Sequence, residues 1–308
     1  MSMIHVRAVS PPDLTDQVVE ILEGDTCVVN LVVQPGIVRS PDGDSITCDV
    51  HRAGANRLLR GLRDIHLDRR GSIIVEPVDT ALSEGTSDTG RFADPPVWEL
   101  VEARIRAEGT YAPSFYLYLV VAGLIGAVGI VTNSQILIVA AMVVGPEYGA
   151  IASIALGIDR GHRGRIKQGV FALVSGFTLA IVSTFLFSLL IRAFGFQSKA
   201  FEAGLRPVSN LIDTPNFFSF AVAGLAGIIG IVSLTEAKTS ALLGVFISVT
   251  TIPAAADIGV SAAFGNGSEV RGSFIQLLVN IVVLVLVGVL TLRIQRAIWC
   301  RVSARARP

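Results

Sequence analysis

The apolar part of this chain contains two related halves. Residues 123–132 read GLIGAVGIVT, and residues 224–233 read GLAGIIGIVS. Each copy is followed by an apolar stretch with a central proline, Pro146 or Pro253, then by a loop and a third apolar stretch. Each half therefore predicts three membrane spans, and an odd number of spans inverts the second half relative to the first. Inverted repeats of this kind are common among secondary transporters.

The composition indicates a membrane protein with a separate, acidic N-terminal domain. The mean hydropathy is +0.63, with 51% hydrophobic and 16% charged residues. Residues 1–94 carry 9 basic and 15 acidic side chains, whereas the rest of the chain carries 16 basic and 10 acidic ones. The N-terminus has no charged segment followed by an apolar core. We therefore expect no cleavable signal peptide and a cytoplasmic N-terminal domain.

The N-terminal domain alternates strand and helix patterns in the order βαββαβ. This order predicts an α+β ferredoxin-like sandwich, with two helices on one face of a four-stranded antiparallel sheet. The expected strands and helices, in chain order, cover residues 4–9, 11–22, 26–33, 46–50, 53–65 and 72–78.

The second expected helix of this domain carries a row of arginines. Such a row can hold an anion, for example a nucleotide phosphate. Alternatively, it is a solvated helix surface partnered by Asp64 and Asp68. The candidate ligand-binding residues of the domain are Arg52, Arg57, Arg60 and Arg63.

The remainder of the chain predicts six membrane spans, each close to the roughly 20 residues that a bilayer requires. We place them at residues 113–131, 135–158, 166–191, 217–234, 240–264 and 273–292. The full order is a cytoplasmic α+β domain (1–79), a linker (80–96), an interfacial amphipathic helix (97–110), a first transmembrane repeat (111–194), an extracytoplasmic loop (195–216), a second repeat (217–293) and a basic cytoplasmic tail (294–308).

Arginines set the expected orientation in the membrane. The loop at 159–167 and the C-terminal tail are both rich in basic residues, and such segments stay in the cytoplasm. Six spans also place both ends of the chain on one side. We therefore expect a multi-pass protein of the cytoplasmic membrane with its N-terminus and C-terminus inside.

The two central prolines predict the candidate site. A proline in mid-helix removes a backbone hydrogen bond, and paired helix breaks at the membrane midplane form the solute site of inverted-repeat transporters. Gly145 and Pro146 are followed by Glu147, an acid near the centre of its span, where a charge is costly and usually functional or paired. Glu147 could bind a proton or a cation, or it could be a structural acid bonded to Asn280 or Thr251.

Two more polar residues of the later spans join the candidate site. Asp257 lies one turn beyond Pro253, nearer the outer surface, where water could reach it. Asn280 is a buried amide that either lines the site or joins helices. The repeated glycines are expected to serve close helix packing rather than phosphate binding.

The sequence has no pattern for enzymatic chemistry, a cofactor or a metal. No histidine lies in a span beside a nucleophile, and a Walker loop is missing. We expect a protein that is not an enzyme, with three reduced, structural cysteines at Cys27, Cys48 and Cys300.

The membrane half resembles a known family. The stretch AGLIGAVGIVTNSQILIVAAMVVGPEYGAIASIALGI, from Ala122 to Ile158, is similar to the first half of the prokaryotic membrane proteins of the domain of unknown function 389 family. The stretch GVFISVTTIPAAADIGVSAAFG is similar to their second half, and the likeness runs over about Pro113 to Leu292. The resemblance implies a cytoplasmic α+β head joined to a helical bundle, with no established substrate.

Two functions fit these patterns. The leading one is a transporter or channel-like protein for a small solute or ion, homo-oligomeric in the bilayer, with a regulatory head. The alternative is a membrane-anchored sensor or scaffold whose head binds a small ligand or a partner. Neither function involves nucleic acid.

Overall fold

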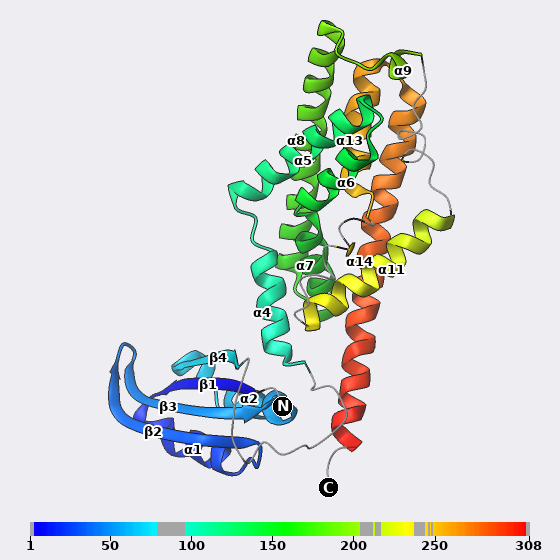
Figure 1. The fold of residues 1–308 in the computed structure, drawn as a ribbon. Helices are drawn as coiled ribbons and strands as arrows, with labels where there is room; N and C mark the ends of the chain where they lie inside the picture. Colours follow the sequence, from blue (N-terminus) through cyan, green and yellow to red (C-terminus); the bar gives the residue numbers. More distant parts are fainter. Residues whose placement is uncertain are drawn as a thin grey trace. The chain divides into compact units, whose positions relative to one another are not determined.

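A computed structural model describes residues 3–78, 96–203, 212, 217–236, 244–245, 247 and 249–305 (Figure 1). The expected linker lies outside these residues, apart from residue 96. The chain divides into two compact units, described separately below. One unit comprises Met1–Glu102 with Trp299–Pro308, and the other is Ala103–Ile298.

The N-terminal unit has the predicted order of strands and helices, with one short helix added. Proline at the first position of α1 suits a helix start, because its missing N–H has no helical acceptor there. The bounds are β1 (Met3–Ser10), α1 (Pro12–Glu23), β2 (Val28–Arg39), β3 (Asp42–His51), α2 (Arg52–Asp64), α3 (Leu67–Arg70) and β4 (Ser72–Val78).

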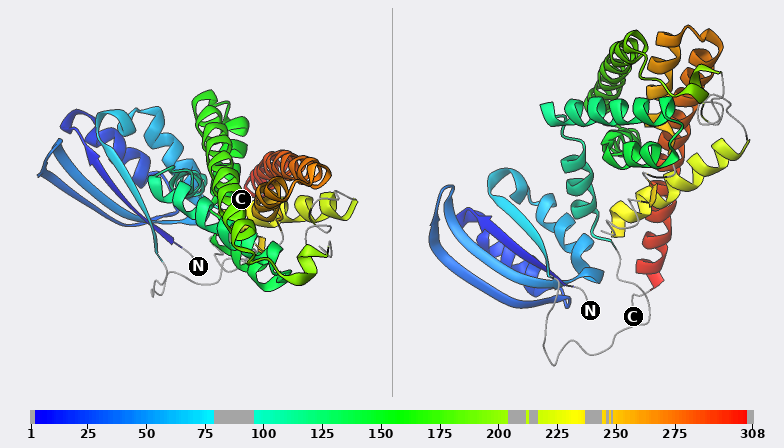
Figure 2. Two further views of the ribbon diagram at one scale, coloured as in Figure 1. Left: turned by 90° about the horizontal axis from the view of Figure 1, so that it is seen from above. Right: turned by 45° about the horizontal axis from the view of Figure 1, so that its top comes forward.

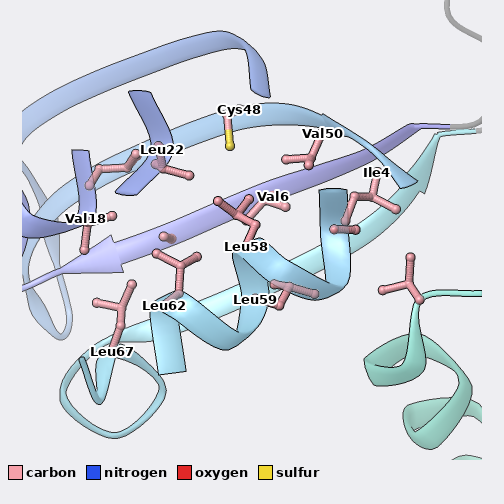
Figure 3. Packing of buried hydrophobic residues seen from close by; sticks show 14 residues of the cluster. Ile4, Val6, Val18, Leu22, Cys48, Val50, Leu58, Leu59, Leu62 and Leu67 are labelled. Carbon is pink, nitrogen blue, oxygen red and sulfur yellow. The ribbon is translucent and has the colours of Figure 1, made fainter. Parts of the chain in front are cut away.

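The four strands form one antiparallel sheet in the order β2-β3-β1-β4. Alternate residues of β1 and β3 point to the face that α1 and α2 cover (Figure 2). These strand residues pack against apolar side chains of both helices to form the core of the unit (Figure 3). The core residues labelled in Figure 3 are Ile4, Val6, Val18, Leu22, Cys48, Val50, Leu58, Leu59, Leu62 and Leu67.

The hairpin of β2 and β3 is longer than the sequence predicts. Pro35 and Gly36 indicate a turn, yet β2 continues through them to Arg39. The pairing shifts register between Gln34 and Val38, and Gly36 takes a positive φ of 63°. An irregularity of this kind accommodates a proline that cannot donate to the ladder, so the strand continues beyond it.

The second unit is helical, and its longest helices are α8 and α14 (Figure 1). The boundary between the units falls within α4, after Glu102, and again within α14, after Ile298. The bounds are α4 (Trp98–Glu108), α5 (Pro113–Val131), α6 (Gln135–Val144), α7 (Glu147–Arg160), α8 (Arg163–Phe194), α9 (Lys199–Glu202), α11 (Phe217–Glu236), α13 (Thr251–Phe264) and α14 (Gly267–Arg305).

Four helices are long and apolar enough to cross a membrane: α5, α8, α11 and α14. A fifth crossing is possible if α6 and α7, which meet at a 49° bend, form one broken span. The remaining predicted span, residues 240–264, is described only in part, and its helix α13 has 14 residues. The described helices therefore establish four or five membrane-capable elements rather than six.

Five of the six repeated glycines lie in close packing contacts, as predicted, whereas Gly224 has nothing within 4 Å of an added Cβ. A Cβ on Gly126 of α5 would lie 2.8 Å from the Cβ of Ala256 in α13. A Cβ on Gly230 of α11 would collide with the hydroxyl of Tyr148 in α7. A glycine of α5 thus allows close approach of α13, and a glycine of α11 allows close approach of α7.

Two polar contacts define the ends of the helical unit. At one end, Arg192 near the end of α8 donates a 2.7 Å hydrogen bond to the carbonyl of Ala263, just before Gly265. At the other end, Arg296 of α14 lies 2.5 Å from Asp159 of α7, and Arg293 lies 3.5 Å from it. We call these the Gly265 end and the basic end.

Candidate functional site

The first element of the candidate site is the break between α6 and α7. Helix α6 ends at Val144, and α7 begins at Glu147. Gly145 has an extended backbone, and Pro146 stands at the N-cap of α7. Because proline lacks an N–H and clashes with the preceding turn, the helix ends there instead of continuing. The predicted helix break is therefore confirmed.

The second element is the start of α13. Pro253 lies in the first turn of this helix, not in the middle of a helix as its place in the expected span suggests. A proline is well tolerated in a first turn, because the N–H it lacks would have no helical acceptor. The first helical hydrogen bond here runs from the Ala254 N–H to the Thr250 carbonyl, at 3.2 Å.

A hydrogen bond joins the starts of these two helices. Thr251 donates from its hydroxyl to Oε1 of Glu147 at 2.6 Å. Glu147 is only 6% exposed, and its Oε2 has no partner among the described residues. That oxygen lies against Gly145, where an added Cβ would also meet the Ile252 side chain at 2.7 Å. Of the two expected partners of Glu147, the structure therefore selects Thr251.

Asn280 contacts the residue next to Thr251. Its side-chain amide donates to the Thr250 hydroxyl at 2.8 Å, and Gln276 donates to the same hydroxyl at 3.3 Å. Gln276 also donates to Oδ1 of Asn280 at 3.3 Å. Asn280 thus joins α14 to the start of α13 and lies beside the junction of the two helices.

Asp257 is buried, contrary to the expectation of a residue in contact with water. It is 0% exposed, and Ser273 of α14 donates to its Oδ2 at 2.7 Å. The expectation was wrong because it rested on distance from the membrane centre, whereas packing between α13 and α14 decides whether water reaches this side chain.

The surroundings of Glu147 act on its charge in two opposite ways. The exposed N–H groups at a helix start favour negative charge, and here the first turns of two helices meet at one carboxylate. Burial among apolar groups opposes that charge unless it is compensated. The two helix starts therefore favour the ionised form of Glu147, whereas burial favours its neutral form. This balance suits a group whose charge changes during a reaction cycle.

The sequence analysis missed two members of this cluster, Thr250 and Gln276. A signal for Gln276 was present in the chain. Glu269, Ser273, Gln276 and Asn280 are spaced by four, three and four residues in an otherwise apolar segment, which places them on one helix face. Thr250 gives no comparable signal, since it stands beside Thr251 in an irregular segment.

The arginines of the N-terminal unit contact other residues of that unit. Arg57 holds Asp25 through two hydrogen bonds of 2.5 and 2.9 Å, Arg63 lies 3.3 Å from Glu99, and Arg60 donates to the Asn56 carbonyl. The acidic partners are thus Asp25 and Glu99 rather than Asp64 and Asp68. Arg52 has a buried Nε without a partner among the described residues.

The charge on Asp25 is stabilised by its neighbours. Burial raises the pKa of Asp25, but the Arg57 side chain and the Cys27 backbone N–H lower it by more, so the pKa lies below its ordinary value. The pair is a salt bridge within the unit. The Asp25 carboxylate therefore fixes the position of the Arg57 guanidinium.

The described residues contain no cluster of three or more histidine, cysteine or acidic side chains able to hold a metal. A cavity of 540 Å³ between α7, α8 and α14 is lined by apolar side chains, apart from Thr178. This cavity does not include the polar junction at Glu147. The polar residues of the junction are therefore the better candidate site for an ion.

The chain was compared with known families, curated proteins and solved structures. No curated protein and no solved structure matches it. One family model does match, over residues 142–286, and its description is "Domain of unknown function (DUF389)". The matched residues include α7, α8, α11, α13 and most of the apolar part of α14, and with them Glu147, Thr251 and Asn280. This match supports membership of the DUF389 family.

Proposed function

We propose that this membrane protein is a transporter or channel-like protein for a small solute or ion. Its binding site is the junction of α7 and α13, which we call the Glu147 junction and define as Gly145, Pro146, Glu147, Thr250, Thr251, Pro253, Gln276 and Asn280. Glu147 is the residue that changes its charge or binds the ion. The N-terminal unit is a regulatory head.

A single observation carries this proposal. The hydrogen bond from Thr251 to Glu147 brings together two helix starts, each next to a proline. In transporters, interrupted helices near the midplane supply the solute site through their exposed backbone groups. A helix break that served only to bend a chain would not require a buried carboxylate at its centre.

The same proposal includes the inverted repeat of three plus three spans. Supporting it, α5 and α11 carry the related glycine segments, α7 and α13 each begin beside a proline, and long α8 and α14 follow them. The reciprocal packing of Gly126 on Ala256 and of Gly230 on Tyr148 is what a two-fold relation between halves would produce.

Orientation and assembly complete the proposal. The basic end faces the cytoplasm, because basic segments remain on that side. The N-terminal unit has the element order and the sheet order β2-β3-β1-β4 of a ferredoxin-like fold, and it lies in the cytoplasm. Several copies of the chain associate in the cytoplasmic membrane.

Thermal-shift measurements test where a ligand binds. We would screen ions, metabolites and nucleotides against the detergent-solubilised protein, Glu147→Gln and Arg57→Ala. A ligand that binds the junction should raise the Tm of the wild type and Arg57→Ala, but not that of Glu147→Gln. A ligand that still stabilises Glu147→Gln and no longer stabilises Arg57→Ala would refute the junction as its site.

The second outcome would support the alternative function, a sensor or scaffold whose head binds a ligand or partner. One observation favours this alternative. Strand β2 lies at an edge of the sheet and exposes Val32, Val33 and Ile37. Exposed apolar side chains on an edge strand are typical of a surface that pairs with another chain.

A further inference from the structure

A groove runs along the surface of the helical unit between α7, α8 and α14. It is the cavity of 540 Å³ described above, and we call it the α8–α14 groove. On its rims, Val174 of α8 and Leu286 of α14 are each 62% exposed. Its floor consists of buried apolar side chains, namely Ile154, Leu173, Phe177 and Leu277. The groove is therefore hollowed between three helices and open on one side.

The wall of the groove suits a hydrocarbon group. Among the described residues that line it, Thr178 is the one with a polar side chain, and its hydroxyl donates to the Val174 carbonyl at 2.7 Å. An empty apolar hollow loses the dispersion contacts of the atoms that line it. Water fills such a space poorly, because an ordered water needs two or more polar partners. An apolar occupant is therefore favoured.

The dimensions of the groove fit a single acyl chain. On α8 its wall runs from Ile166 to Ile181, which at 1.5 Å per residue is about 22 Å. One leaflet supplies about half of the roughly 30 Å hydrocarbon core, so an acyl chain is shorter than the groove. A helix with side chains is about 10 Å across, so a helix of this length occupies roughly 1,700 Å³, about three times the cavity. The groove thus fits a thin, flexible chain better than a helix.

Exposed basic side chains continue both walls of the groove at the basic end. On α8, Lys167 stands seven residues before Val174, about two turns along the same helix face. Arg163 stands about one turn further along that face. On α14, Arg293 stands seven residues after Leu286 in the same way. One end of the groove therefore carries cations on both sides.

The acidic group beside this end is outnumbered by arginines. Asp159 follows Ile158, which lines the groove, and it accepts a hydrogen bond from Arg296. It also lies 3.5 Å from Arg293. One carboxylate thus faces two arginines, and the cations of α8 add further positive charge. Basic pockets between membrane helices bind anionic lipid headgroups, so this end of the groove suits a lipid phosphate.

We propose that the α8–α14 groove is a binding site for an anionic phospholipid of the bilayer. One acyl chain lies in the groove, and the phosphate contacts Arg163, Lys167 and Arg293. A zwitterionic lipid would supply the same chain, but it would place an ammonium group among these cations. The inference goes beyond the proposed function and does not depend on it, since a lipid can occupy this groove in a transporter or in a sensor.

Native mass spectrometry of the full-length protein, released from detergent micelles, tests the headgroup site. The probes are phosphatidylglycerol and phosphatidylcholine with identical acyl chains. The wild type should bind phosphatidylglycerol at least tenfold more tightly, because each basic side chain near the membrane surface strengthens binding of an anionic lipid about fivefold. Lys167→Gln should weaken phosphatidylglycerol binding about fivefold. Lys199→Gln, which removes an exposed cation of α9 outside the groove, should leave it unchanged.

A second pair of variants tests the groove itself. Val174→Trp places a large side chain on the rim of the groove, and it should weaken binding of phosphatidylglycerol more than tenfold. Leu225→Trp adds the same side chain to α11, where Leu225 is 63% exposed, and it should bind the lipid as the wild type does. Both positions are exposed, so both variants should keep the Tm of the wild type.

The outcomes separate the lipid from other occupants. Equal affinity for the two lipids, or equal effects of Lys167→Gln and Lys199→Gln, would overturn the anionic headgroup. Undiminished lipid binding by Val174→Trp would overturn the groove as the site. The same spectra report the number of subunits. An oligomer that dissociates in Val174→Trp but not in Leu225→Trp would overturn the lipid and assign the groove to a second copy of the chain.

Discussion

Glu147 and Thr251, the first residues of α7 and α13, are joined by a 2.6 Å hydrogen bond although they lie 104 residues apart in the chain. The contact connects the break between α6 and α7 to the start of α13. Pro146 stands at that break, and Pro253 lies in the first turn of α13. We propose that the Glu147 carboxylate binds the ion. This contact therefore joins the starts of α7 and α13, and it includes the carboxylate that takes part in the proposed function.

Removing the Thr251 hydroxyl should destabilise the helical unit. Thr251→Val leaves Glu147 Oε1 without its described donor, and an unpaired buried polar group costs about 1–3 kcal/mol. The Tm of the detergent-solubilised protein should fall. Thr178→Val is the matched control, because the Thr178 hydroxyl bonds the Val174 carbonyl on an exposed part of α8. Equal Tm values for Thr251→Val and Thr178→Val would contradict the importance of this contact.

Two glycines of α11 should respond differently to the same substitution. Gly230→Ala places a methyl group on the hydroxyl of buried Tyr148, and overpacking of this kind costs about 1–3 kcal/mol. Gly224→Ala meets nothing within 4 Å and should be tolerated. Adding Tyr148→Phe should recover part of the loss in Gly230→Ala. A similar Tm for the two glycine variants would show that α11 does not pack on α7 in this way.

The N-terminal unit should lose stability in acid through Asp25. Because the pKa of Asp25 is lowered in the fold, its ionised form contributes stability that is fully present above the unfolded pKa of about 3.9. This contribution is lost as the pH falls through the lower, folded pKa. Asp25→Asn should therefore destabilise the unit at pH 6, and its effect should shrink as the pH falls below the unfolded pKa.

Cys48 provides a probe for that measurement. Burial, and then the charge of Asp49, raise the pKa of Cys48 to about 11, and the side chain is inaccessible in the folded unit. Its labelling by 4,4′-dithiodipyridine, with Cys27 and Cys300 replaced by serine, reports opening of the sheet. A constant ratio of labelling rates between Asp25→Asn and its parent from pH 6 to pH 3 would contradict the assigned role of Asp25.

At the basic end, Asp159 should matter more than its exposed partner. The Asp159 side chain is almost fully buried and accepts a 2.5 Å hydrogen bond from Arg296. Asp159→Asn should lower the free energy of unfolding by about 2 kcal/mol, as expected when a hydrogen bond between charged groups is weakened. Arg293→Gln removes the longer 3.5 Å contact of a mostly exposed side chain, so its effect should be smaller. The opposite order of unfolding energies would refute this assignment.

Local sequence signals predicted the elements but not all of their contacts. Pro146 predicted a helix break because its effect is confined to the adjacent turn. The hairpin extension through Pro35 and Gly36 was missed, because the same residue types occur in turns and in strand irregularities.

The burial of Asp257 could not be predicted, since it depends on how α14 packs on α13. The sequence left Thr251 and Asn280 as possible hydrogen-bond partners of Glu147, because both lie at a similar depth in their expected spans. Only the packing of the helices shows that Thr251 is the partner.

The central claim is that Glu147 is the ion-binding group of a transporter. The most direct measurement is flux into liposomes that contain the purified full-length protein, its Glu147→Gln variant or its Ser188→Ala variant. The variants must first be shown to reconstitute equally and to unfold at comparable temperatures. We predict flux of an ion or solute through the wild type and Ser188→Ala, and none above empty liposomes through Glu147→Gln. Undiminished flux through Glu147→Gln, or no flux through the wild type for any ion or solute tested, would contradict the claim.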